Sequence, residues 1–170
     1  QSVTTEALAG LEILDLQAMS TDQVRAFTND QLQALSTAQV HAFKTDQLAA
    51  LTTTQVASLT SLQIAALSTT QVAAFGTAQI AAMTNDELAG LNTADIAGLS
   101  SAQLAALSTD QLTSMDADLI AAIETNDIAG LTTTQVEALT TVQFSAMTTE
   151  QLGALTTTQF RSEEHTSELQ

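Results

Sequence analysis

The feature that most constrains this chain is an eight-residue repeat that runs from Thr4 to Phe160 without an insertion. One copy, residues 20–27, reads Ser-Thr-Asp-Gln-Val-Arg-Ala-Phe. With Thr4 as position one, position five is apolar in every copy, position eight is apolar in all 19 complete copies, and position seven is always Ala, Gly or Ser. Position four is Gln in 14 of 20 copies. A period this regular indicates a repeat architecture, in which each unit packs on its neighbours.

Each octad is expected to form one short helix. Its apolar positions do not alternate with the period of two that a strand requires. One continuous helix is excluded because eight residues turn through about 800°, so the apolar stripe would drift by about 80° per copy. Position one is Ser, Thr, Asn or Asp in 16 of 20 copies, and these residues favour helix N-caps. Together with Gln at position four they form a capping box, which predicts a helix that restarts in every octad.

Helices this short are unstable alone, so we expect an all-α solenoid in the form of an elongated rod. The core is predicted at positions five and eight, and the small residue at position seven should let a neighbouring helix approach to about 8 Å. Val occupies position five only in octads of one parity, as at Val24, Val40 and Val56. This alternation predicts two helices, or 16 residues, per coil. A triangular coil of three helices and 24 residues is the alternative.

Two segments are expected. Residues 1–160 form the octapeptide-repeat solenoid, which begins in mid-repeat and is predicted to be a fragment of a longer array. Residues 161–170, Arg-Ser-Glu-Glu-His-Thr-Ser-Glu-Leu-Gln, have no octad character. All ten resemble the translation of a common sequencing adapter, so this tail is interpreted as non-native and unstructured.

Composition restricts the partners. The net charge is −16, and Arg25, Lys44 and Arg161 are the only basic residues. We therefore expect no nucleic-acid partner, because too few cations are present to neutralise phosphates. No apolar run approaches 18 residues, so no membrane insertion is expected. The absence of Cys excludes disulfides and thiolate metal sites.

No residues form a predicted catalytic, cofactor-binding or metal site, and the chain is not expected to be an enzyme. His41 is a single histidine at exposed position six, and His165 lies in the tail. Acidic residues cluster where the repeat is least regular, at Asp116, Asp118 and Glu124, with Asp127 nearby. The start of this cluster is similar to a calcium loop, but Ile120 occupies a ligand position and the required Gly is missing. Substituted caps are the preferred interpretation, and a weak cation site is the alternative.

Paired hydroxyls recur at positions one and two, as at Thr52-Thr53 and Thr132-Thr133. They are interpreted as caps and soluble corners. The alternative is a Thr-rich edge that carries glycans, associates laterally or binds ice.

Octads such as residues 51–59, LTTTQVASL, and residues 67–75, LSTTQVAAF, resemble those of very long exported bacterial adhesin-like proteins. Such proteins are often labelled as haem-utilisation or adhesion proteins. The resemblance implies a bacterial extracellular or cell-surface location and a structural or adhesive role as spacer, stalk or scaffold, in weak multivalent contact with surface or matrix polysaccharide or with sister rods. It does not imply haem here, because His41 is the only histidine in the repeats. The alternative is a binding module that uses a solenoid face or the Thr-rich edge to recognise a glycan, ice or a protein.

Overall fold

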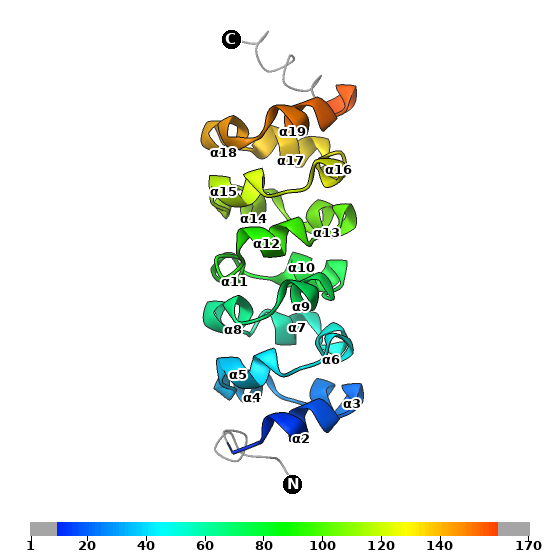
Figure 1. Cartoon of the computed structure of the whole chain (residues 1–170), viewed down its shortest axis with the longest axis vertical. Coiled ribbons are helices and arrows are strands. Elements are labelled where there is room, and N and C mark those ends of the chain that lie inside the picture. The colour runs from blue at the N-terminus through cyan, green and yellow to red at the C-terminus, as the bar shows by residue number, and fades with distance from the viewer. Residues whose placement is uncertain (1–9, 160–170) are drawn as a thin grey trace.

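The computed structural model describes residues 10–159, which form an elongated rod of short α-helices, one per octad (Figure 1). The all-α solenoid predicted from the sequence is thus confirmed. The segment 161–170 lies outside the described residues, so its interpretation as a non-native tail stays a prediction. The helices are α2 (Ile13–Ala18), α3 (Thr21–Arg25), α4 (Asn29–Ala34), α5 (Thr37–His41), α6 (Thr45–Ala50), α7 (Thr53–Val56), α8 (Ser61–Ala65), α9 (Thr69–Ala73), α10 (Thr77–Ala82), α11 (Asn85–Leu88), α12 (Thr93–Ala97), α13 (Ser101–Ala106), α14 (Thr109–Ser114), α15 (Ala117–Ala121), α16 (Thr125–Ile128), α17 (Thr133–Ala138), α18 (Thr141–Ala146) and α19 (Thr149–Ala154).

The described helices begin at the predicted capping box, except α2, α15 and α16, which have no side-chain cap bond. In α3, the Ser20 hydroxyl accepts a hydrogen bond from the Gln23 amide at 3.3 Å, and Gln23 Oε1 accepts one from the Ser20 amide at 2.8 Å. Where position one offers no side-chain acceptor, at Lys44 and Gly76, the glutamine half of the box remains. The box satisfies backbone donors that a helix start otherwise leaves unpaired.

The corners between helices are made of ordinary extended backbone. After α4, Leu35 adopts φ −68° and ψ 140°, and Ser36 adopts φ −67° and ψ 160°. No residue in the described range has a positive φ, and the chain contains no Pro. The helix breaks are therefore produced by the cap side chains and by the burial of position eight, without proline and without a residue in the left-handed region.

The coil holds about three and a half helices, so the predicted coil of two helices and 16 residues is wrong. Each helix packs on the helix three further along, as α3 on α6 and α15 on α18. Hydrogen bonds link residues 28 apart, such as Gln55 to the Phe27 carbonyl. A 28-residue coil is also longer than the 24-residue alternative. Each helix consequently lies over the corner that connects two consecutive helices of the coil below.

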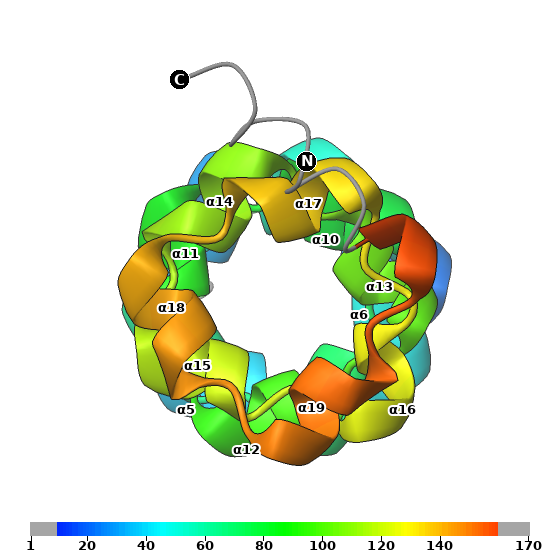
Figure 2. The same ribbon diagram turned by 90° about the horizontal axis from the view of Figure 1, so that it is seen from above.

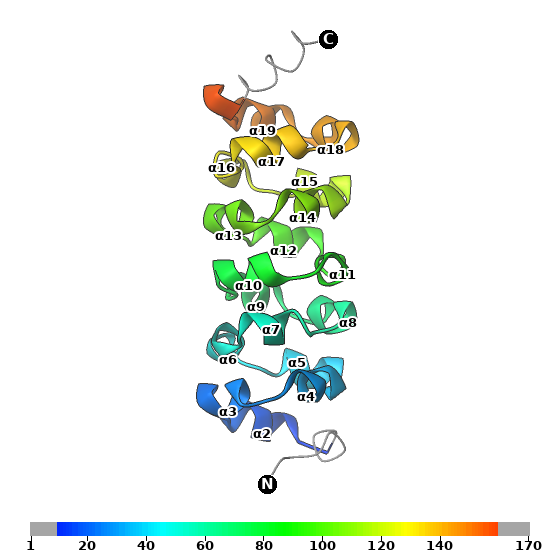
Figure 3. The ribbon, with the colours of Figure 1, turned by 180° about the vertical axis from the view of Figure 1, so that it is seen from behind.

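The coil is right-handed. Seen from the α19 end, α16, α17, α18 and α19 follow one another counterclockwise as the chain rises toward the viewer (Figure 2). Helices seven apart, such as α12 and α19, share one direction around the rod axis, which is the arrangement that two coils of three and a half helices require. From behind, α7, α14 and α17 face the viewer (Figure 3).

The recurrence of Val at position five in alternate octads does not match the geometry of this coil. Octads that share a direction around the axis are seven apart and therefore differ in parity, so Val at position five is not confined to one side of the rod. Nothing in the packing explains the alternation.

The core follows the predicted positions. Leu48, Ile64 and Leu104, all at position five, are completely buried, and Leu51 and Leu67 at position eight are nearly so. These side chains belong to one continuous apolar cluster that extends from Leu11 to Leu155. Because each helix is too short to fold alone, this shared cluster and the joints between coils must provide its stability.

Close packing at position seven is also confirmed. A Cβ placed on Gly90 would lie 2.4 Å from the Ser61 carbonyl oxygen, and one on Gly130 would lie 2.4 Å from the Ser101 Cβ. In these octads, position seven therefore rests on position two of the helix three octads earlier. By contrast, a Cβ on Gly153, at position six, would contact nothing within 4 Å.

We expect Gly90→Ala to destabilise the rod by about 1–3 kcal/mol, because the added methyl meets backbone rather than a flexible side chain. The matched change Gly153→Ala in α19 should stabilise it by about 0.5–1 kcal/mol, since it removes a glycine from an exposed helix interior. Urea denaturation of the two variants measures both effects. Equal changes in the free energy of unfolding for the two variants would show that position seven does not pack closely against another helix.

Candidate functional site

The group that recurs most regularly in the structure is the side-chain amide of the position-four glutamine. Gln63 Oε1 accepts a hydrogen bond from the Thr60 amide of its own helix at 2.9 Å. Gln63 Nε2 donates to the carbonyl oxygens of Leu32 at 2.9 Å and Leu35 at 2.7 Å, both at the end of α4. One planar amide thus caps the start of α8 and the end of a helix in the coil below.

The same bridge recurs along the rod. Twelve glutamines donate Nε2 to the carbonyl 28 residues earlier, at distances of 2.6 to 3.1 Å: Gln39, Gln47, Gln55, Gln63, Gln71, Gln79, Gln103, Gln111, Gln135, Gln143, Gln151 and Gln159. All twelve side chains are buried. Their partners are carbonyls at helix ends, which otherwise have no acceptor role within the helix. The bridge therefore satisfies polar groups at both of the helix ends that each joint buries.

Only an amide can fill this position completely. An ionised Glu has acceptors alone, whereas Gln combines one acceptor with two N–H donors. Glu and Gln serve equally well in a capping box. The preference for Gln at position four thus reflects the bond to the coil below, which the sequence analysis did not identify.

Two aspartates at position four form a different joint. Asp95 Oδ1 accepts a hydrogen bond from the Thr69 hydroxyl at 3.1 Å. Asp127 Oδ1 accepts from the Ser101 amide at 2.8 Å and also from its hydroxyl. Both bonds reach 26 residues back, to the start of the helix three octads earlier. The shorter side chain therefore bonds the N-terminal donors of one helix instead of the C-terminal carbonyls of another.

Glu87 at position four is only partly satisfied. Its Oε2 accepts from the Thr84 amide at 2.6 Å and the Thr84 hydroxyl at 3.1 Å. Its Oε1 is buried without a hydrogen-bond partner, and the residue is 2% exposed. Desolvation by burial raises the pKa of Glu87 above its ordinary value, against the lowering effect of the bonds to Thr84.

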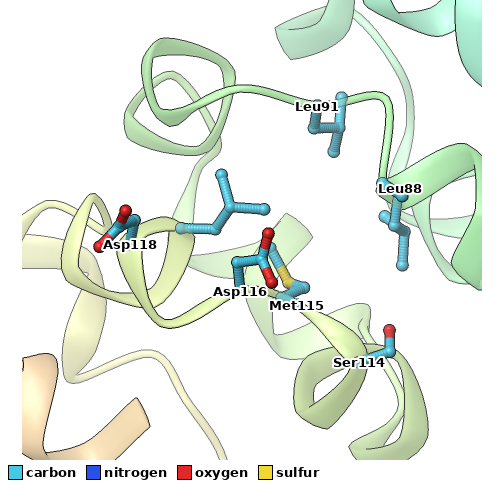
Figure 4. Close-up of a pocket in the computed structure, with 8 residues that line it drawn as sticks. Leu88, Leu91, Ser114, Met115, Asp116 and Asp118 are labelled. Carbon is cyan, nitrogen blue, oxygen red and sulfur yellow. The ribbon is translucent and has the colours of Figure 1, made fainter. Parts of the chain in front are cut away.

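Leu119 at position four offers no amide at all. A pocket of about 210 Å³ lies beside it and is lined by Leu88, Ala89 and Leu91, which precede Leu119 by 31, 30 and 28 residues (Figure 4). These are the spacings that separate a bridging glutamine from its carbonyl partners elsewhere. The pocket therefore marks a missing bridge.

The structure does not bring the four acidic residues of the candidate cation site together. Asp116 and Asp118 line the pocket beside Leu119, whereas Glu124 lines another with Thr148 and Gln151. Asp127 is bonded to Ser101, as described above. Within residues 10–159, no three His, Cys, Asp or Glu side chains are placed to hold a metal ion.

His41, the histidine of the repeats, is exposed, and its Nδ1 lies 2.6 Å from the Ala66 carbonyl oxygen. It therefore contacts the end of α8 in the next coil. In the described part of the chain, no helix combines the length and apolar character needed to span a bilayer.

The paired threonines do not lie along one edge. The hydroxyls of Thr132, Thr140 and Thr148, at position one, accept the cap bonds of their helices. Because a coil contains three and a half octads, these successive corners lie in different directions around the axis (Figure 2). The pairs are thus distributed around the rod.

Comparison with known proteins agrees with this pattern. The profile of the family described as ALTTAQ repeat matches residues 8–45, 30–61, 57–85, 84–117 and 120–157. The chain belongs to the ALTTAQ repeat family. The six letters of that name span two octads, from the small residue at position seven of one to the bridging Gln at position four of the next, as in residues 154–159, ALTTTQ. No curated protein matches the chain, and no solved structure does.

The bridge can be tested in this ALTTAQ protein by exchanging the amide for a carboxylate. Gln63→Glu keeps the capping acceptor but removes the donors to Leu32 and Leu35, so we expect it to cost about 1–3 kcal/mol at neutral pH. Gln23→Glu is the matched control, because Gln23 is exposed and bonds Ser20 in the first described coils. It should change stability by less than about 0.5 kcal/mol. Thermal unfolding measures both, and equal losses would contradict the bridge.

Leu119→Gln should add the missing bridge. The new amide would reach the carbonyls of Leu88 and Leu91 and fill part of the pocket, stabilising the rod by about 0.5–1.5 kcal/mol. The measurement is the midpoint of urea unfolding. A loss of stability would show that the pocket is not a vacant bridge position.

Proposed function

We propose that this chain is a structural and adhesive module, a stiff spacer or scaffold segment of a bacterial extracellular or cell-surface protein. The observation that carries the proposal is the joint between coils, where a bridging glutamine recurs from Gln39 to Gln159 with a constant spacing of 28 residues. A contact that recurs along a continuous core favours a rod whose length grows with the number of octads.

The surface supports a collective role. Position three is exposed in the octads of the described range and is most often Asp, Thr or Ala, as at Ala38 and Asp46. Weak identical contacts of this kind gain strength through multivalency rather than through one strong site. We therefore propose weak binding to a surface polysaccharide, a matrix or sister rods, and no enzymatic activity.

A binding module that recognises a glycan, ice or a protein through a Thr-rich edge is the alternative. The distribution of the paired threonines around the rod favours the first proposal. A flat ligand would contact only those corners that share its side of the rod.

Rods of 6, 12 and 19 octads, counted in the repeat from Thr4, test the adhesive role. We expect retention on bacterial cells or matrix to rise steeply with octad number, because each added coil adds equivalent weak contacts. Circular dichroism of each rod checks that it is folded. Absent retention, or equal retention for all three lengths, would leave only a passive spacer.

A further inference from the structure

We propose that the joint of α11 on the coil below is a pH-dependent break point in the rod, with Glu87 as the group that controls it. When Glu87 is neutral, its carboxyl O–H donates to a backbone carbonyl and the joint closes. When Glu87 is ionised, the joint loses its donor and opens before the glutamine joints do.

The repeat supplies the acceptors for this bond. A position-four glutamine donates to carbonyls 28 and either 30 or 31 residues earlier. Counted back from Glu87, these spacings reach Leu59, Ala57 and Val56 at the end of α7. Glu87 already uses Oε2 on Thr84, just as Gln79 uses Oε1 on Gly76. The remaining oxygen, Oε1, is buried without a partner and therefore corresponds to the glutamine Nε2.

Within the described residues, no positive charge lies near the ionised carboxylate of Glu87 to offset its desolvation. The residues of α7 and α8 include no titratable group. Asp86 on α11 and Asp110 on α14, which packs against α11, are both acidic. Arg25 and Lys44, the basic residues of the described range, lie on or beside α3 and α6. A buried carboxylate with no cation nearby, beside carbonyl oxygens, is unfavourable.

The direction of the pH effect follows from the two protonation states. Since the folded-state pKa of Glu87 is raised by desolvation, folding favours the protonated form. The stabilising contribution is complete below the unfolded pKa and is lost as the pH rises through the folded pKa. The joint is therefore strongest in acid and weakest at neutral and higher pH.

The experiment compares thermal unfolding of the full chain, Glu87→Gln and Glu150→Gln from about pH 4 to about pH 8. Glu87→Gln installs the bridging residue of the other octads, so we expect a Tm above wild type by about 2–4 °C at the higher pH and a difference near zero at the lower. Glu150→Gln removes the same charge at an exposed site where hydrogen bonds, first from its own backbone amide, lower the pKa. The Tm of Glu150→Gln should therefore not rise above that of wild type at the higher pH.

Two further readouts locate the effect. Hydrogen exchange, corrected for intrinsic rates, should show α11 and α8 of the wild type opening about tenfold more often at the higher pH, while the Gln79 joint is unchanged. Carbon NMR of the carboxyl groups should show Glu87 ionising at a higher pH than Glu150. A Tm difference that does not vary with pH, or the reverse order of ionisation, would overturn the proposal.

Discussion

The rod depends on one interaction, the side-chain amide of glutamine that joins two helix ends. A helix of four to six residues leaves most of its backbone donors and acceptors unpaired, and burying such ends without partners would be prohibitive. In the ALTTAQ octad, Gln63 accepts from the start of its own helix and donates to the end of α4. The bond fixes which carbonyl of the lower coil lies beneath which glutamine amide, so it sets the spacing of 28 residues as well as the stability of the contact between coils.

Departures from this interaction define the weak places in the rod. Acidic residues replace the glutamine in four octads, and three of these, octads 84–91, 92–99 and 124–131, also have Gly at position seven. A Cβ on any of those glycines would lie 2.4 to 2.6 Å from the helix three octads earlier. The aspartates use this closeness to bond that helix, whereas Glu87 keeps one oxygen unpaired. A structural array can thus vary its joints without changing its core.

Much of the fold could be predicted from local chemistry. The capping box of Ser20 and Gln23, the burial of Leu104 and the close packing at position seven all depend on neighbours within one helix or on residue size. The number of helices per coil could not be predicted, because the recurrence of Val in alternate octads reflects no contact between coils. The informative signal was Gln itself, since a capping box alone would accept Glu. The pocket beside Leu119 was likewise invisible without the 28-residue spacing.

The most direct test of the account is a set of distances around the coil. The chain has no Cys, so spin labels can be placed on cysteine substituted at Asp30 and, in turn, at Ala78, Asp86 or Ala94, all exposed and at position three. These pairs are separated by 48, 56 and 64 residues. A 28-residue coil predicts that the distance from residue 30 to residue 86 is the shortest, because two full coils bring the labels to the same side of the rod. A shortest distance from residue 30 to residue 78 would contradict it and indicate a coil of 16 or 24 residues.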